Sequence, residues 1–236
     1  MGVSDFGETP GEGILCRQCR LVPPPFEVAV AHGVYQDTLR SLLHLLKYEG
    51  LEPIAAKLGG LIAERIAQII ELPGRMLVVP VPLFKGRRRE RGFNQAELLG
   101  RAVIRSMRSL RPDWEGEFAP GVLARQRATQ SQAGLSPDER RRNLRGAFFV
   151  ADPTRVQGRD VLVIDDIYTT GATARACSQA LRRAGTATVW VATAARAQRR
   201  QAEVFRREPV TEVPQHKGEL PMHEDVAIWD GGTRVQ

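Results

Sequence analysis

An uninterrupted apolar run, residues 161–164, is followed directly by the aspartates Asp165 and Asp166. A run of this length that contains valine and isoleucine is typical of a central strand in a parallel sheet, where both faces of the strand are covered. Small and hydroxyl-bearing residues follow at 168–173, and good helix formers at 174–183 end before Gly185. The pattern therefore predicts a strand, a tight loop and the first turn of a helix.

Hydrophobic periodicity predicts further elements along the chain. Residues 26–35 alternate loosely and favour one or two antiparallel strands. Leucines at helical spacing predict a helix from Asp37 that stops at Gly50, and Asn94 is the expected cap of a later helix. The remaining predicted elements are helices over about 53–72, 91–110 and 136–143, strands at 76–82, 122–124, 147–150 and 188–194, and a polar connection at 111–120.

The length of 236 residues fits one α/β domain with extensions. We expect a disordered start with half of a zinc ribbon at 1–25, a main domain at 26–196 and a mostly disordered, charged tail at 197–236. No stretch approaches the roughly 18 to 20 apolar residues of a membrane helix, and the start lacks a signal pattern. The expectation is a cytoplasmic protein without membrane insertion.

The net charge of +7 and the pI of about 9.9 suit an anionic partner, either nucleic acid or a phosphorylated small molecule. Arg101, Arg105 and Arg108 recur at i, i+4 and i+7 on one predicted helix and form a basic stripe that could follow a phosphate backbone. Few aromatic residues lie nearby for base stacking, which weakens that interpretation. The basic run at 85–91 is either a solvated face or, because it follows a strand end, part of a ligand loop.

Two of the three cysteines, Cys16 and Cys19, have the spacing of half a zinc knuckle. A second ligand pair is missing from the sequence, so the two thiols are either part of a zinc site or simply reduced. Cys177 falls on the helix predicted after the aspartates and is expected to be a small core residue.

The strand, loop and helix around Asp165 and Asp166 have the features of an anion site. The first amide groups of a helix have no intrahelical partner, and the helix dipole favours negative charge there. Thr169, Thr170 and Thr173 could add hydroxyl donors, and Gly171 permits close approach. The aspartates would repel phosphate and instead suit a sugar diol. Two alternatives remain for the pair. The carboxylates could cap loop amides, or they could form the metal pocket of a receiver-like domain. That pocket follows the first strand of its fold, whereas this pair lies far down the chain.

The stretch 161–173 resembles the phosphoribosyl pyrophosphate (PRPP) signature of type I phosphoribosyltransferases. The resemblance implies a type I phosphoribosyltransferase-like α/β fold, a parallel sheet flanked by helices, with ribose hydroxyls on Asp165 and Asp166 and a Mg²⁺ ion carried by PRPP. The residues that would cradle the 5-phosphate are Tyr168, Thr169, Thr170, Gly171, Ala172 and Thr173.

Further blocks are similar to the ComF family, a phosphoribosyltransferase-like group associated with DNA uptake. They are the pair Cys16 and Cys19, the block 46–50, and the segments 79–82, 91–95, 132–135 and 140–148, together with the signature. The family commonly carries another CxxC upstream, which is absent here. The resemblance implies that Lys85 or Arg87 holds pyrophosphate in the loop after Pro82, and that a mobile hood includes Arg127, Gln132, Arg140 and Asn143.

Two hypotheses follow, from different classes. The chain is either a phosphoribosyltransferase with an unidentified acceptor, or an accessory of DNA uptake that retains the PRPP fold and binds single-stranded DNA or a helicase partner. Lys47, at the end of the first predicted helix, is either a solvated charge or a residue that reaches the site.

Overall fold

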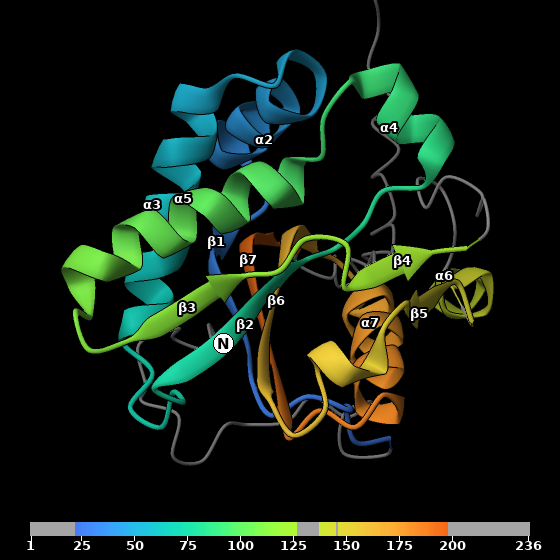
Figure 1. The fold of residues 1–236 in the computed structure, drawn as a ribbon. Coiled ribbons are helices and arrows are strands. Elements are labelled where there is room, and N and C mark those ends of the chain that lie inside the picture. Colours follow the sequence, from blue (N-terminus) through green and yellow to red (C-terminus); the bar gives the residue numbers. More distant parts are fainter. Residues whose placement is uncertain (1–21, 127–136, 145, 198–236) are drawn as a thin grey trace, which may run out of the picture. The chain divides into compact units, whose positions relative to one another are not determined.

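The structure is a computed structural model that describes residues 22–126, 137–144 and 146–197. Within these residues, five strands form one sheet in the order β1-β7-β6-β2-β3, and all neighbouring pairs are parallel (Figure 1). The strands are β1 (Ala29–Val34), β2 (Arg75–Pro80), β3 (Glu115–Phe118), β6 (Asp160–Tyr168) and β7 (Thr188–Arg196). The predicted α/β class with a parallel sheet is confirmed, and the signature strand β6 lies at its centre.

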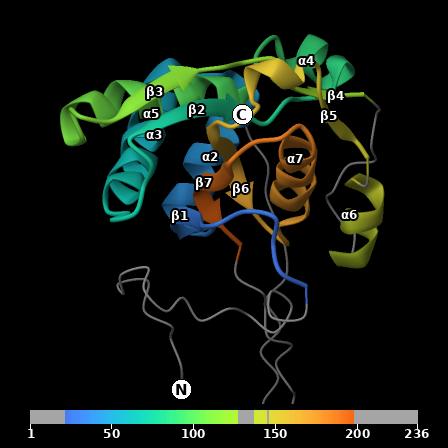
Figure 2. The ribbon, with the colours of Figure 1, turned by 60° about the horizontal axis from the view of Figure 1, so that its bottom comes forward.

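Helices cover both faces of this sheet (Figures 1 and 2). Side chains alternate along a strand, so Leu162 and Ile164 of β6 pack with one layer while Val161 and Val163 pack with the other. The first layer contains α2 (Asp37–Glu49), α3 (Glu52–Ala67) and α5 (Gln95–Leu110). The second contains α7 (Ala172–Arg183), α6 (Pro137–Leu144) and the antiparallel pair of β4 (Leu123–Arg125) and β5 (Phe148–Val150).

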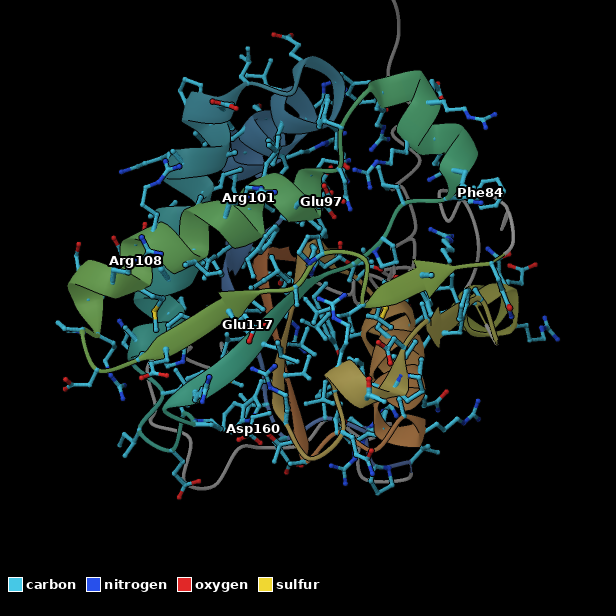
Figure 3. The ribbon with its side chains drawn as sticks, viewed as in Figure 1. Phe84, Glu97, Arg101, Arg108, Glu117 and Asp160 are labelled. Carbon is cyan, nitrogen blue, oxygen red and sulfur yellow. The ribbon has the colours of Figure 1, made fainter. Side chains whose placement is uncertain are left out.

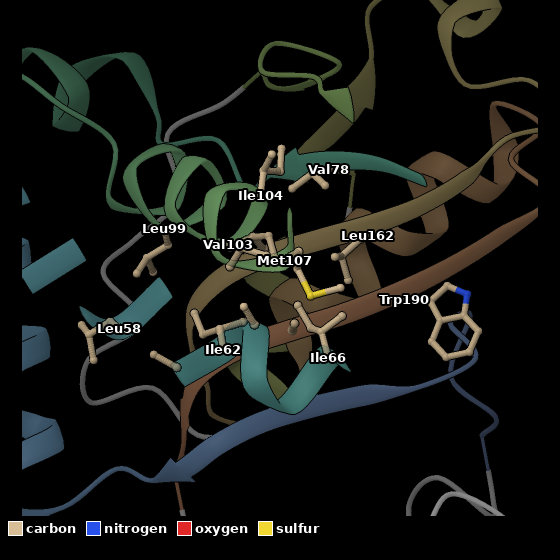
Figure 4. Packing of buried hydrophobic residues seen from close by; sticks show 14 of the residues in the cluster. Leu58, Ile62, Ile66, Val78, Leu99, Val103, Ile104, Met107, Leu162 and Trp190 are labelled. Carbon is tan, nitrogen blue, oxygen red and sulfur yellow. The ribbon is translucent and has the colours of Figure 1, made fainter. Parts of the chain in front are cut away.

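The larger core joins α3 and α5 to the sheet (Figure 4). Amphipathic spacing on each helix places one apolar stripe toward the strands. The buried residues that meet there include Leu58, Ile62 and Ile66 of α3, Leu99, Val103 and Met107 of α5, and Val78, Leu162 and Trp190 of the sheet. Cys177, predicted to be a core residue, belongs to α7 and is buried in the second core.

Most predicted elements are present, and the helix termini carry the stop and cap residues on which the predictions were based. Helix α2 starts at Asp37 and ends at Gly50, which takes a left-handed conformation (φ 62°). Helix α5 is capped by Asn94, whose side-chain oxygen accepts a hydrogen bond from the Ala96 amide. Strand β6 runs on through both aspartates to Tyr168, farther than the apolar run indicated.

Two predictions from periodicity were wrong. The segment at 26–35 forms the single strand β1, which pairs in parallel with β7 and not as antiparallel strands, because loose alternation carries no information on strand direction. Helix α3 ends at Ala67 rather than near Leu72. The guanidinium of Arg111 donates to the carbonyl oxygens of Ala67 and Ile69, so the C-cap residue of α5 satisfies backbone groups at the end of α3.

Two elements were not predicted. Strand β3 lies within the expected polar connection and pairs with β2 at the sheet edge, with Phe118 as its apolar anchor. Helix α4 (Lys85–Arg91) occupies the basic run that the sequence left as either a solvated face or part of a ligand loop. All residues of α4 are described and none is buried, so the helix has no apolar stripe that periodicity could detect.

Replacing Gly59 with alanine is expected to destabilise the fold, because the new Cβ would overlap the side chain of Ala102 where α3 crosses α5. Overpacking of this kind costs about 1–3 kcal/mol. The neighbouring Gly60→Ala is the control: its Cβ would lie 3.7 Å from Ser106 Oγ, so it should keep the roughly 0.5–1 kcal/mol gain in helix propensity. Urea denaturation measures both, and equal stability of the two variants would contradict the tight crossing.

Candidate functional site

A crevice forms where strand β6 outruns strand β2. The last paired residues of the two strands are Pro80 and Ile164, and the final bond is donated by the Val81 amide to the Ile164 carbonyl at 2.9 Å. Beyond that point β6 still pairs with β7, through Asp165 opposite Thr193, but no longer with β2. The carboxyl end of β6 therefore has one open side, and open α/β sheets bind ligands at such an edge.

The two aspartates occupy this open edge and point to opposite faces of the sheet, as neighbouring strand residues do. Asp165 Oδ1 accepts a hydrogen bond from the Asp166 amide at 2.9 Å. Burial, followed by the negative charge of Asp166, raises the pKa of Asp165 to about 8. Asp165 therefore holds a proton at neutral pH when no cation or diol compensates its charge.

Lys47 supplies the counter-charge for the second aspartate. Its ammonium Nζ lies 2.9 Å from Asp166 Oδ2, and both side chains are largely shielded from solvent, at 26% and 15% exposed. Burial acts to lower the pKa of Lys47, but the charge and hydrogen bond of Asp166, assisted by Asp165, outweigh it and the pKa is raised. The ion pair settles the alternatives left for Lys47, since helix α2 brings it into the site.

Two arginines approach from the other side. Arg87 comes from α4 and Arg125 from β4, and both line the same cavity as the aspartates. Burial, followed by the positive charge of Arg87, lowers the pKa of Arg125. Like charges converge at a folded site only at an energetic cost, and an anion bound between the two guanidinium groups would remove it.

The loop after β6 leads into helix α7. Gly171 is the N-cap residue and takes a left-handed conformation (φ 75°), and a Cβ there would overlap the Tyr168 hydroxyl. Glycine is therefore required on two counts. Thr170 Oγ1 is buried without a hydrogen-bond partner among the described residues. The first-turn amides of α7, which have no intrahelical partner, follow directly in the chain and favour an anion.

The start of helix α5 borders the same crevice as residues 169–171, the loop between β6 and α7 that is called the threonine loop below. The Asn94 side chain is buried, and its Nδ2 donates to the Val81 carbonyl at 3.0 Å while its Oδ1 caps the helix. One side chain thus ties the exit loop of β2 to the first turn of α5. Gln95, also buried, lines the cavity from this position.

These elements enclose a cavity of about 380 Å³. Among the described residues, four cationic side chains and two carboxylates line it, so both signs of charge face the same space. The charged lining residues are Lys47, Arg87, Arg91, Arg125, Asp165 and Asp166, and the polar and apolar ones are Tyr35, Val81, Pro82, Leu83, Asn94, Gln95, Ala96, Ile167, Thr169 and Thr173.

The residues proposed for the site from sequence are distributed unevenly. Asp165, Asp166, Thr169, Thr173 and Arg87 line the main cavity. Tyr168, Gly171 and Ala172 line a small adjoining cavity of about 10 Å³, whose lining has Asp165, Thr169 and Thr173 in common with the main cavity. Thr170 lines neither cavity. Lys85 lies at the exposed start of α4, outside both linings, and Arg140 and Asn143 lie in α6.

Several proposed residues lie outside the described part of the chain. They are Cys16 and Cys19 of the zinc motif, and Arg127 and Gln132 of the hood. In contrast, Arg125 and Gln95 line the cavity although sequence reasoning assigned them no role, and Arg91 does so as one member of the basic run at 85–91. Arg91 and Gln95 belong to the block 91–95, whose similarity to the ComF family could have indicated them. Arg125 reaches the cavity only through the pairing of β4 with β5.

Comparison with known proteins places the chain among named relatives, although no family model matches it. The DNA utilization protein YhgH of Escherichia coli O157:H7 is 37% identical over 181 residues, which are 75% of each chain. Competence protein F of Haemophilus influenzae is 30% identical over 186 residues, which are 77% of this chain and 78% of that protein. The chain belongs to the ComF family.

Competence protein ComFC of Bacillus subtilis is a more distant match in the family, 28% identical over 153 residues. The family membership agrees with the resemblance found in the sequence, and the parallel sheet flanked by helices agrees with the predicted α/β class. Solved structures that match include glutamine PRPP amidotransferase from B. subtilis, at 16% identity and a TM-score of 0.40, covering 63% of this chain and 30% of that one. A hypoxanthine phosphoribosyltransferase from Staphylococcus aureus matches at 14% identity and a TM-score of 0.34, covering 60% and 62%.

Two further features were sought in the described residues of this ComF-family member. Among the described residues, no group of three or more His, Cys, Asp or Glu side chains could hold a metal ion. Within the same part of the chain, no helix combines the length and the apolar character that crossing a membrane requires.

The raised pKa of Asp165 predicts a pH-dependent effect on stability. The folded state keeps the proton up to about pH 8, while the unfolded state releases it near pH 4, so this residue makes the fold less stable as pH rises between these values. Asp165→Asn should therefore raise Tm relative to wild type by at least about 2 °C more at pH 8 than at pH 5.

Thermal unfolding of both proteins across that range measures the difference. Asp160→Asn, at the opposite end of β6 (Figure 3), is the control for removing one carboxylate from the same strand. A variant whose Tm difference from wild type is constant with pH would show that Asp165 is ionised in the folded state.

Proposed function

We propose that the cavity at the end of β6 binds PRPP with Mg²⁺, and that the protein transfers the phosphoribosyl group to an acceptor with release of pyrophosphate. The observation that carries the proposal is the joint lining of one cavity by Asp165, Asp166, Thr169, Thr173 and Arg87. These groups match the three parts of the ligand. The carboxylates accept hydrogen bonds from a diol, the amides at a helix start donate to a phosphate, and the guanidinium pairs with the pyrophosphate.

Each part of the ligand has a distinct partner in the proposal. The ribose hydroxyls donate to Asp165 and Asp166. The 5-phosphate accepts from the first-turn amides of α7 and from the hydroxyls of the threonine loop, where the buried Thr170 Oγ1 lacks a partner among the described residues. The pyrophosphate lies toward Arg87 and Arg125, whose convergence favours a bound anion.

The residues fit a magnesium ion that arrives with the ligand. Mg²⁺ in phosphate sites is commonly held by one or two carboxylates, substrate oxygens and water. Asp165 and Asp166 are such a pair, and a cation beside them would oppose the effects that raise the pKa of Asp165. When bound, the ion would neutralise charge on the departing pyrophosphate.

The transfer breaks the bond between the anomeric carbon and the pyrophosphate oxygen, and the electron pair leaves with pyrophosphate. A lone pair of the acceptor forms the new bond to that carbon, and the acceptor releases its proton to solvent. Positive charge develops on the sugar ring between these events, and Asp165 and Asp166 stabilise it electrostatically. Arg87 and Arg125 stabilise the negative charge of the leaving group. The acceptor is left open.

Binding of PRPP provides the direct test. Calorimetric titration with PRPP and Mg²⁺ should show saturable binding by wild type, and the double variant Asp165→Asn/Asp166→Asn should bind at least about 100-fold more weakly, because each hydrogen bond to a charged group is worth roughly 1.5–3 kcal/mol. Asp160→Asn, on the same strand but distant from the cavity, should bind as wild type does.

Folded wild-type protein that binds no PRPP would overturn the proposal. Equal binding by the double variant would overturn the assigned roles of the two aspartates. Pyrophosphate release in the presence of candidate acceptors then separates an enzyme from a protein that only binds the ligand.

A second candidate function, binding of single-stranded DNA, is favoured by one observation on α5. Arg101, Arg105 and Arg108 are all exposed along this helix, and Figure 3 shows Arg101 and Arg108 on it. The guanidinium of Arg101 also lies 4.5 Å from the centre of the Phe118 ring, which holds it in place. The relatives named for DNA utilization and competence support a role connected with DNA.

Replacing these three arginines with glutamine should reduce the salt dependence of single-stranded DNA binding. Each phosphate contact contributes about 0.7 to the slope of log K against log salt for single strands, so the slope should become shallower by roughly 2. The control removes the same charge from exposed positions on other helices, through Arg40→Gln, Lys57→Gln and Arg183→Gln. Equal slopes for the two triple variants would contradict a specific path along α5.

A further inference from the structure

Helix α4 brings arginines to the cavity without any hydrophobic attachment. Arg87 and Arg91 line the cavity, yet none of the helix's residues, all of which are described, is buried. Figures 1 and 2 show α4 at the periphery, beyond the amino-terminal end of α5. Most helices in proteins are held by packing of an apolar face, so the orientation of α4 must come from polar contacts.

A bidentate ion pair provides such a contact. The two guanidinium nitrogens of Arg88 donate to the two carboxylate oxygens of Glu97 at 2.7 and 3.2 Å. Glu97 belongs to the first turn of α5 and is only 20% exposed. Its carboxylate is favourably placed at a helix start and lies 3.5 Å from Asn94 Nδ2. One end of the pair is therefore fixed to the rigid part of the site.

Helix geometry converts this anchor into an orientation. Residues four apart share one face of a helix, whereas the next residue along is turned by about 100°. When Arg88 is fixed on Glu97, Arg87 and Arg91 are directed toward the cavity that they line. The Arg91 guanidinium lies 5.7 Å from the centre of the Tyr48 ring, a second contact of α4 with the first layer. The left-handed Gly92 then ends the helix.

We propose that Arg88 and Glu97 form a latch that holds α4 in the orientation in which Arg87 and Arg91 bind the pyrophosphate group of the ligand. This inference rests on the proposed function and deepens it. Arg88 and Glu97 are positioning residues, because neither lines the cavity. The latch acts on the pyrophosphate and not on the ribose 5-phosphate part, which the strand β6 and the loop before α7 would bind.

Charge reversal tests the latch, with two probes. Titrations with PRPP and with ribose 5-phosphate, both with Mg²⁺, compare wild type with Arg88→Glu, Glu97→Arg and the double swap. Each single reversal should weaken PRPP binding by roughly fivefold or more, because repulsion replaces a bidentate attraction. Glu97→Arg is the sharper variant, since the positive charge that it adds would otherwise strengthen binding of an anion.

The double swap, the ribose 5-phosphate titration and a variant of Arg89 serve as controls. The double swap should return PRPP affinity to within about twofold of wild type, as a restored pair does in a double-mutant cycle. Ribose 5-phosphate affinity should stay within about twofold in all variants, because that part of the site does not depend on α4. Arg89→Glu changes the charge of the same helix at an exposed residue outside the ion pair and the cavity lining, and it should weaken PRPP less than Arg88→Glu does.

The outcomes separate the two proposals. Wild type that binds neither probe overturns the proposed function and the latch with it. Wild type that binds both, beside single variants with unchanged PRPP affinity, overturns the latch alone. Equal loss of both ligands, or a double swap without recovery, also overturns the latch, because it indicates general damage rather than a lost orientation.

Discussion

The site depends on where strand β2 stops pairing with strand β6. In a parallel ladder the backbone groups of successive residues face alternate neighbours, and here Val81 faces β6 while Val78 and Pro80 face β3. Strand β3 has already ended opposite Val78, so the missing amide hydrogen of Pro80 removes no ladder bond. After Val81 the chain leaves the sheet, and the rest of β6 borders open space. The crevice is a consequence of strand lengths and requires no distortion of the sheet.

The alternation of β6 then decides which elements serve the two aspartates. Asp166 faces the layer that contains α2 and therefore meets Lys47, at 2.9 Å. Asp165 faces the layer that contains α7 and the β4-β5 pair. On that side, the positive charge of Arg125 from β4 acts to lower the pKa of Asp165. Burial and the negative charge of Asp166 raise the pKa of Asp165, and the positive charges of Lys47 and Arg125 oppose this only in part. A diol or a cation would supply what this half of the pair lacks.

The sequence predicted the parts of the fold that local patterns encode. The apolar run of β6, the glycine stop of α2 and the Asn94 cap each depend on neighbouring residues, and the structure has all three. The end of α3 depends on Arg111, which is distant in sequence, and it was placed too late. The parallel pairing of β1 with β7 is equally non-local. Helix α4 escaped prediction because none of its residues is buried, so it has no apolar spacing to detect.

The candidate site divides in the same way. The signature residues are contiguous, so one motif located Asp165, Asp166 and the threonine loop. Arg125 could not be found from its neighbours, because it joins the cavity only after β4 pairs with β5. Lys47 could be noticed but not assigned, since its partner Asp166 is distant in the chain and follows from the packing of α2.

The mixture of charges constrains what the cavity can accept. A ligand with phosphate groups alone would compensate Arg87, Arg91 and Arg125 but offer no hydrogen-bond donor or cation to Asp165 and Asp166. A neutral sugar would satisfy the carboxylates and leave the arginines to repel one another. The whole lining is matched by a molecule that presents hydroxyl donors or a cation to the aspartates and anionic groups to the arginines. A sugar phosphate with a bound divalent ion has that distribution, whereas a nucleic-acid backbone suits the exposed arginines of α5 better than this cavity.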